Sequence, residues 1–227
     1  ESDVLAEQPT QIAERFAMVP DCPICVPLGE HLSCGVVGKR ARCVALGKNL
    51  IVQAAAHHSY CDLRIVVLCE QEETAQWEFC RWLPHCWDEG HTARLIANTP
   101  ETIRALLERL EPVFSARAAA GQNAGLGAAP RAKPWYLFVC AAPETVTQHA
   151  FMKFLTANRR ELGISVLYLF DRIDLLPEEC HDILDCREAV GVLFERRHAA
   201  RRQPFQPKQV PQGRYEQFAR SMAPLRM

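Results

Sequence analysis

One glycine-rich segment of the chain has residue types that could bind phosphate. Residues 35–43 read GVVGKRARC. A phosphate-binding loop, G-x-x-x-x-G-K-[ST], holds phosphates with backbone amides and a lysine, and places a hydroxyl on magnesium. The candidate nucleotide-binding residues are therefore Gly35, Gly38, Lys39 and Arg40. Because the segment is too short and lacks the hydroxyl, we favour a tight turn that lets a helix pack on a strand, with weak phosphate binding as the alternative.

Hydrolysis of ATP would also require an acidic residue at the end of a neighbouring buried strand, where it holds the metal and orients water. The apolar segment 135–140 is followed by Ala141, Ala142 and Pro143, and the nearest acid is Glu144. With both the hydroxyl and this acid missing, the sequence assigns no catalytic residue and no metal ligand. We expect no ATP hydrolysis, no cofactor, and at most weak binding of ATP.

Eleven cysteines are the other residues with reactive side chains. Cys22 and Cys25 form a C-x-x-C, but a structural zinc site needs a second pair at similar spacing, and the sequence has none. Cys80 with Cys86, near His85, and Cys180 with Cys186, near His181, leave a mixed site as the alternative. We expect reduced thiols, as in a cytosolic protein, with neither zinc nor disulfides.

Residues 81–87 read RWLPHCW and concentrate aromatic rings and polar donors. Trp and Arg are common both in packed corners and in interface hot spots. We expect the indoles of Trp82 and Trp87 to be largely buried, with Arg81 at the rim. If the segment contacts a partner, the interface residues are Arg81, Trp82, His85 and Trp87.

Hydrophobic patterning predicts the elements that position these residues. Short apolar segments predict buried strands, and segments with apolar residues on one helical face predict amphipathic helices. Strands are predicted at 63–69, 93–98, 135–141, 164–170 and 190–195, helices at 39–58, 72–83, 100–114, 149–162 and 214–222, and a hairpin from 23–28 and 31–37. This alternation is typical of a mainly parallel sheet with helices on both faces.

The chain divides into three predicted regions. Residues 1–30 form a lead-in segment and the start of the hairpin, residues 31–198 form the α/β domain, and residues 199–227 form a tail that leads to a further domain. Within the α/β domain, the Ala- and Gly-rich segment 115–134 is predicted to be a mobile loop. The chain begins with Glu1, which suggests a piece of a longer protein.

The overall charge argues against contact with nucleic acid. There are 26 Lys and Arg against 27 Asp and Glu, so the formal net charge is 26 − 27 = −1. Proteins that track a phosphate backbone need a basic surface.

Several short strings resemble one family, the EssC/EccC membrane ATPases of type VII secretion systems in the FtsK/SpoIIIE group. The similarity is to the first cytosolic domain, between the transmembrane helices and the first full ATPase module. RWLPHCW and HSYCD are the most specific strings. The strings are NLIVQ at 49–53, HSYCD at 58–62, WEF at 77–79, RWLPHCW at 81–87, GIS at 163–165 and FAR at 218–220.

This resemblance implies a RecA-like, P-loop-NTPase-like fold with a degenerate phosphate loop. It also implies a domain on the cytoplasmic side of the cell membrane, inside an ATP-driven secretion motor. Because this chain lacks the hydroxyl and the strand-end acid, we expect the domain to be non-catalytic and to couple the membrane part of the motor to its ATPase modules. Its partners would be other domains of the same motor chain, membrane components of the system and, through the whole motor, WXG-type secreted proteins. Asp171 and Arg172 correspond to the position where active modules place a nucleotide-sensing residue.

Two other functions stay open at this point. Some relatives of this domain are thought to bind or hydrolyse ATP, so a nucleotide-binding or weakly active regulatory ATPase domain is the first alternative. A component of a DNA translocase is the second, and the near-neutral charge weighs against it.

Overall fold

The computed structural model describes residues 9, 12, 22–123 and 132–224. Most of the predicted lead-in segment, and residues 124–131 of the predicted loop, lie outside the described residues. The helices are α2 (Leu28–His31), α3 (Arg40–His57), α4 (Thr74–Trp77), α5 (Pro100–Asn123), α6 (Pro143–Thr147), α7 (Met152–Leu155) and α8 (Gln212–Met222), and the short 3-10 turns are η1 (Gln71–Glu73), η2 (Glu78–Trp82), η3 (Pro84–Cys86), η4 (Arg160–Leu162) and η5 (Ile173–Leu175).

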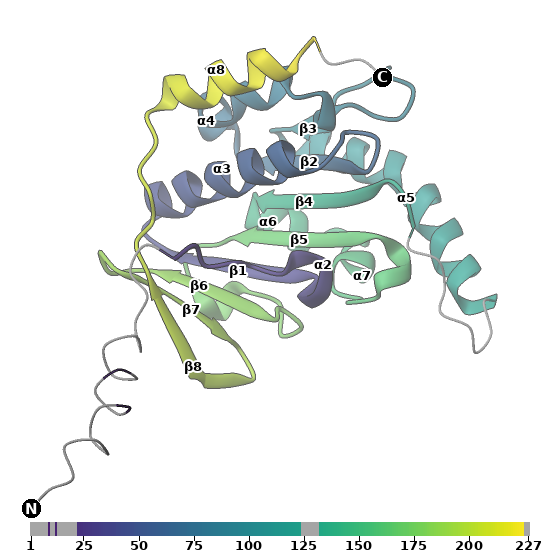
Figure 1. Ribbon diagram of the computed structural model, residues 1–227. Helices are drawn as coiled ribbons and strands as arrows, with labels where there is room; N and C mark the ends of the chain where they lie inside the picture. Colours follow the sequence, from purple (N-terminus) through teal and green to yellow (C-terminus); the bar gives the residue numbers. More distant parts are fainter. Residues whose placement is uncertain (1–8, 10–11, 13–21, 124–131, 225–227) are drawn as a thin grey trace, which may run out of the picture.

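The described strands form one mostly parallel sheet (Figure 1). Their order is β3-β2-β4-β5-β1-β6-β7-β8, in which β1 to β6 run parallel and β7 and β8 are antiparallel. The strands are β1 (Ser33–Gly38), β2 (Leu63–Cys69), β3 (Ile96–Ala97), β4 (Trp135–Ala141), β5 (Ile164–Leu169), β6 (Asp182–Cys186), β7 (Gly191–Glu195) and β8 (His198–Phe205). The carboxyl ends of β1, β2, β4 and β5 therefore share one edge of the sheet.

Helices cover both faces of the sheet, because successive side chains of each strand point to opposite faces. On one face, α5, α6 and α7 pack on a cluster that includes Phe114, Phe138 and Tyr168. On the other face, α3 and α8 pack on a cluster that includes Ile51, Ile65 and Leu167. Figure 1 shows α3 and α8 together on one side of the sheet. The two core clusters fix the strands, and with them the edge of the sheet at which the carboxyl ends of β1, β2, β4 and β5 lie. Within the described residues, no helix has the length and apolarity needed to span a membrane.

Two predicted helices are broken into shorter pieces. In the predicted helix 72–83, Trp77, Cys80 and Leu83 are all buried at a spacing of three residues, which suits the three-residue turn of a 3-10 helix. In the predicted helix 149–162, Asn158 takes a left-handed backbone conformation with φ 47°. Asn tolerates this conformation, which cannot continue a helix.

The predicted hairpin and part of the predicted mobile loop are also wrong. Residues 22–27 form no strand, since Pro23 and Pro27 have no N–H to donate to a sheet ladder. Residues 115–123 continue helix α5, because Ala favours helix strongly. Arg117 anchors this extension by donating to the carbonyl oxygens of Leu162 (2.9 Å) and Pro134 (2.9 Å).

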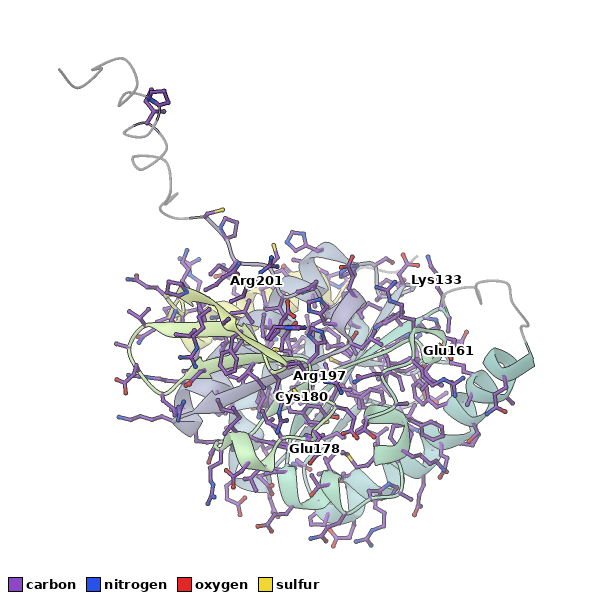
Figure 2. The ribbon with its side chains drawn as sticks, turned by 90° about the horizontal axis from the view of Figure 1, so that it is seen from below. Lys133, Glu161, Glu178, Cys180, Arg197 and Arg201 are labelled. Carbon is purple, nitrogen blue, oxygen red and sulfur yellow. The ribbon has the colours of Figure 1, made fainter. Side chains whose placement is uncertain are left out.

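The carboxyl-terminal part of the chain joins the domain more closely than the sequence indicated. Strand β6 was not predicted, and β8 lies in the predicted tail but pairs with β7. Helix α8 packs against α3 and η2. Figure 2 labels Arg197, at the turn of the β7–β8 hairpin, and Arg201, in the middle of β8. The polar sequence of β8 hides it from a search for apolar alternation.

Candidate functional site

Strand β1 passes into helix α3 with almost no loop between them. The strand ends at Gly38 and the helix begins at Arg40, so Lys39 alone connects them, with extended backbone. The amide of Gly38 donates to the carbonyl oxygen of Asp171, at 3.2 Å. A phosphate is held by several free amides at the turn that precedes a helix. This connection lacks the residues to form such a turn.

The two glycines of the candidate loop are explained by close packing. Gly35 lies inside β1 rather than in a turn, and a Cβ there would come within 2.4 Å of Leu176 Cδ1. Gly38 has φ +138°, and its Cβ would lie 2.7 Å from the carbonyl carbon of Cys186. The expected glycine turn over residues 35–38 is therefore corrected to a strand that closely contacts its neighbours.

The guanidinium of Arg40 fills the space at the carboxyl ends of β4 and β5. It makes a two-pronged ion pair with Glu73, with Nε–Oε1 at 2.5 Å and Nη2–Oε2 at 2.6 Å. It also donates to the carbonyl oxygens of Leu169 (2.6 Å) and Ala141 (2.5 Å), which end those two strands. In open α/β sheets this crevice is the usual place for a ligand. Here a side chain of the protein occupies it.

The charge of Arg40 is balanced mainly by one partner. Burial lowers the pKa of the guanidinium, but the hydrogen bonds and charge of Glu73 outweigh it, so that its pKa is raised. The carboxylate of Asp171 is farther away, at 3.8 Å, and half of it is exposed. The site is thus a closed cation–anion pair, and the cation stays charged at any physiological pH.

Two other predicted nucleotide contacts, Lys39 and Arg172, are not part of this pair. Lys39 is exposed, and within the described part of the chain it has no ion-pair partner. Arg172 pairs with Asp174 in solvent, with Nε–Oδ1 at 2.9 Å and Nη2–Oδ2 at 2.6 Å. Of the six predicted nucleotide-binding residues, the structure brings together Gly38, Arg40 and Asp171.

Sequence reasoning missed Glu73, the residue that completes the site. It searched for an acid after strand β4, where Glu144 is exposed on α6. The acid instead follows β2, in the stretch Glu70 to Glu73. Burial raises the pKa of Glu70, with the neighbouring acids Glu72, Glu144 and Glu73 adding to the effect of burial and Arg40 opposing it. An acid-rich stretch directly after a buried strand was the available signal.

The segment 81–87 is mostly buried. Trp82 and Trp87 are each partly exposed with most of their surface buried, and Trp82 packs against a core cluster, so the expectation that both indoles are largely buried, with Arg81 at the rim, is confirmed. Arginine covers each ring: Arg220 lies 4.1 Å from the centroid of Trp82, and Arg94 lies 3.6 Å from that of Trp87. Such stacking shields the part of each indole that remains at the surface.

Two residues of this segment have clear local roles. His85 is fully buried, and its Nε2 contacts the carbonyl oxygen of His58 at 2.8 Å. Arg81 is exposed and pairs with Glu78, at 2.9 Å. His85 is therefore placed to hold the end of α3 rather than to contact a partner, whereas Arg81, Trp82 and Trp87 reach the surface.

The cysteines divide into buried and exposed groups, and all eleven are free thiols. Burial raises the pKa of Cys43 and of Cys69 to about 12, and that of Cys186 to about 11. Thiols with such high pKa values hold little thiolate, which is the metal-binding and nucleophilic form. The exposed thiols are those of Cys22, Cys25 and Cys61.

Comparison with known proteins finds similarity along nearly the whole chain. It is 26% identical over 226 residues to the ESX secretion system protein EccC of Geobacillus thermodenitrificans, which covers 99% of this chain and 15% of that protein. It is 23% identical over 225 residues to the type VII secretion system protein EssC of Staphylococcus aureus (strain NCTC 8325 / PS 47), covering 98% of this chain and 15% of that protein. The chain thus spans about 15% of the length of these relatives. No protein-family model matches it.

Solved structures with a similar fold are also found. EssC ATPases 2 and 3 of Geobacillus thermodenitrificans match with a TM-score of 0.64 at 9% identity, covering 86% of this chain and 44% of that one. The cytoplasmic domain of the type VII secretion ATPase EccC of Thermomonospora curvata matches with a TM-score of 0.57 at 14% identity, covering 85% and 28%. The mainly parallel α/β fold is confirmed and is consistent with a RecA-like arrangement. The expected resemblance is confirmed as well: nearly the whole chain is similar to one segment of the EssC/EccC proteins of type VII secretion.

Proposed function

We propose that this chain is a non-catalytic, ATPase-like domain of a type VII secretion motor. It couples the membrane part of the motor to its ATPase modules and works through protein contacts. The similarity to EccC and EssC along nearly the whole chain supports a type VII secretion motor as the parent protein. The chain corresponds to about 15% of the length of those relatives. The partners proposed are the other domains of the same motor chain, the membrane components and, through the whole motor, WXG-type secreted proteins. The proposed location is the cytoplasmic side of the cell membrane.

The observation that carries the non-catalytic proposal is the position of Arg40. Catalysis of phosphoryl transfer depends on a metal, a lysine and an acid that are held together around the phosphates. Here the residue after the lysine is an arginine whose guanidinium contacts Glu73 and two strand-end carbonyl groups. The guanidinium thus occupies the carboxyl edge of the sheet, and Glu73 is paired with it. ATP with magnesium would have to displace this ion pair in order to bind.

One observation favours the alternative, a domain that binds nucleotide weakly. Lys39 is exposed at the amino terminus of the 18-residue helix α3, where the helix dipole attracts anions. A phosphate group could meet Lys39 without entering the space that Arg40 fills. This would give weak binding that depends on Lys39 and needs no magnesium.

Calorimetric titration with ATP and magnesium, combined with a phosphate-release assay, tests the proposal on the 227-residue chain. We expect no heat of binding at ATP concentrations below the millimolar range, and a rate of phosphate release no higher than that of buffer without protein. Lys39→Ala is the matched variant, because its exposed side chain can be removed without disturbing the core. Micromolar binding that Lys39→Ala abolishes would support the nucleotide-binding alternative. Turnover that Lys39→Ala abolishes would overturn the non-catalytic proposal.

A further inference from the structure

Two histidines and one aspartate meet at the edge of the sheet opposite to Arg40. His31 ends α2 just before β1, while His181 and Asp182 lie at the start of β6, about 150 residues later. The strands β1 and β6 are parallel neighbours, with Cys34 opposite Asp182. This pairing brings the three side chains together, so that one ligand atom from each lies within 4.8 Å of the others. Cys180, labelled in Figure 2, marks the segment that leads into this cluster.

The carboxylate of Asp182 is the centre of the cluster. His31 Nδ1 lies 2.8 Å from its Oδ2, and His181 Nδ1 lies 3.0 Å from its Oδ1. The side chain of Asp182 is only 4% exposed, whereas those of His31 and His181 are 28% and 38% exposed. The two imidazole rings stack, with their centroids 4.0 Å apart. A buried carboxylate is thus covered by two imidazoles that solvent can reach.

The backbone around His181 is held in place. Its amide donates to Ser33 Oγ at 3.1 Å, and its carbonyl oxygen accepts from the amide of Arg196 at 2.8 Å. Ser33 Oγ in turn contacts the carbonyl oxygen of Glu179, at 3.2 Å. Held by strand β1 on one side and by residue 196 on the other, the ligand-bearing segment is ordered before any ligand arrives.

From this geometry we propose that His31, His181 and Asp182 bind one Zn²⁺ ion. Zinc takes imidazole nitrogen and carboxylate oxygen at about 2.0–2.2 Å, which in a tetrahedral site places neighbouring ligand atoms about 3.3 Å apart. The present contacts, 2.8 Å to Oδ2 and 3.0 Å to Oδ1 of Asp182, are hydrogen bonds that zinc would replace, and the three ligand atoms already lie within 4.8 Å of one another. Three protein ligands leave one position, on the exposed side of the histidines, for water or for a group of a partner.

The charges and protons of the cluster suit a divalent cation. Without metal, Nδ1 of each imidazole is in hydrogen-bond contact with a carboxylate oxygen of Asp182. To bind zinc, each ring would present the lone pair of Nδ1 and carry its proton on Nε2. The buried carboxylate then neutralises part of the metal charge. Imidazole with one carboxylate favours zinc and related transition metals over calcium or magnesium, which prefer oxygen ligands alone.

This site differs from the expectation that the chain holds no metal. The sequence search considered sets based on cysteine and included His181 only with Cys180 and Cys186. The thiol of Cys180 is buried and is directed to the backbone carbonyl oxygen of Asp182, at 3.6 Å, and it is not a member of this cluster. The actual set joins residues from the two ends of the domain, which spacing in the sequence cannot show.

Isothermal titration of the purified chain with zinc chloride at pH 7.5 tests this site. Cys22, Cys25 and Cys61 are first replaced by Ser, because these exposed thiols would bind zinc themselves. We expect one zinc ion per chain, with affinity reduced at least about tenfold in His31→Gln and in His181→Gln. The matched control is His57→Gln, which removes an exposed histidine at the end of α3 and should leave binding unchanged.

A second readout distinguishes this set of ligands from others. Cobalt bound to nitrogen and oxygen shows visible absorption without the intense near-ultraviolet bands of thiolate ligands. The visible bands should appear when cobalt is added to the variant in which Cys22, Cys25 and Cys61 are replaced by Ser. They should be absent when this variant also carries His181→Gln. The proposal is overturned if zinc does not bind, or if His31→Gln and His181→Gln bind it as His57→Gln does. Far-UV circular dichroism checks that each variant is folded. Asp182→Asn, which removes the carboxylate ligand, should also lose zinc binding, but the two histidine variants test the proposal even if Asp182→Asn fails to fold.

Discussion

Arg40 and Glu73 form a two-pronged ion pair, with both nitrogen–oxygen distances between 2.5 and 2.6 Å, at the edge of the sheet where this fold binds ligands. The two residues come from different connections, one after β1 and the other after β2. Their side chains are 27% and 18% exposed, so the pair is largely shielded from solvent. We therefore expect the loss of either partner to lower the free energy of unfolding more than the loss of a partner in an exposed ion pair does.

Removal of either member of this pair should destabilise the protein. We expect Arg40→Ala to lower the free energy of unfolding by about 2 kcal/mol, because Glu73 and two carbonyl oxygens lose their donor. In a double-mutant cycle with Glu73→Gln, measured by urea unfolding, the coupling energy should be about 1–2 kcal/mol. The exposed pair of Arg81 and Glu78 is the control, and its coupling should stay below about 0.5 kcal/mol. Equal coupling in the two pairs would contradict this view of the site.

Gly38→Ala should destabilise the protein through contacts with the backbone. The positive φ of Gly38 is unfavourable for alanine, and the new Cβ would lie 2.7–2.8 Å from backbone atoms of Cys186 and Arg187. We expect a loss of roughly 1–3 kcal/mol from the backbone conformation, in addition to the cost of the contact. Gly29→Ala is the control, since nothing lies within 4 Å of its Cβ position. If thermal denaturation shows the same midpoint for both variants, Gly38 is not needed for packing.

Thiol labelling should separate the cysteines into two groups. In the native protein, we expect Ellman's reagent to react quickly with Cys22, Cys25 and Cys61 and slowly with the eight buried thiols. The buried thiols are both inaccessible and protonated, as burial raises the pKa of Cys43 to about 12. Unfolding in guanidinium should then release all eleven. A rapid native reaction of Cys140 or Cys180 would show that the core is open.

Stability should fall as the pH is lowered through the range where histidine titrates. Burial lowers the pKa of His85 below its ordinary value of 6.5, so the unfolded chain binds a proton there more readily than the folded chain does. The contribution is fully present above about pH 6.5 and is lost as the pH falls below this value. Nδ1 of His85 is buried without a hydrogen-bond partner, so its protonation would leave an unpaired donor in the core.

His85→Gln should make this pH dependence shallower. Glutamine retains an N–H that can reach the carbonyl oxygen of His58, but it does not titrate. Urea unfolding at intervals from pH 5 to pH 8 measures the effect, with His57→Gln as the exposed control. The assignment fails if the two variants show the same slope.

Local sequence patterns determined the central elements of this protein. The apolar segments at 63–69, 135–141 and 164–170 are β2, β4 and β5 within one residue, and the helix predicted at 39–58 is α3. These predictions succeeded because burial on both faces requires an apolar residue at nearly every position of a strand, which the sequence shows directly. Gly35 and Gly38 were predicted to form a turn, whereas both lie in β1 and are required by close contacts with Leu176 and with the backbone of Cys186 and Arg187.

Only the tertiary structure decided which side chains meet at the two edges of the sheet where the strands begin and end. Glu73 is 33 residues from Arg40 in sequence, and Asp182 is 151 residues from His31. Each pair meets only because the order of the strands places their ends side by side. A periodic pattern reports which face of an element is buried, but it carries no information about which distant element lies next to it. The ion pair that fills the ligand crevice and the histidines that cover Asp182 therefore follow from topology and not from spacing along the chain.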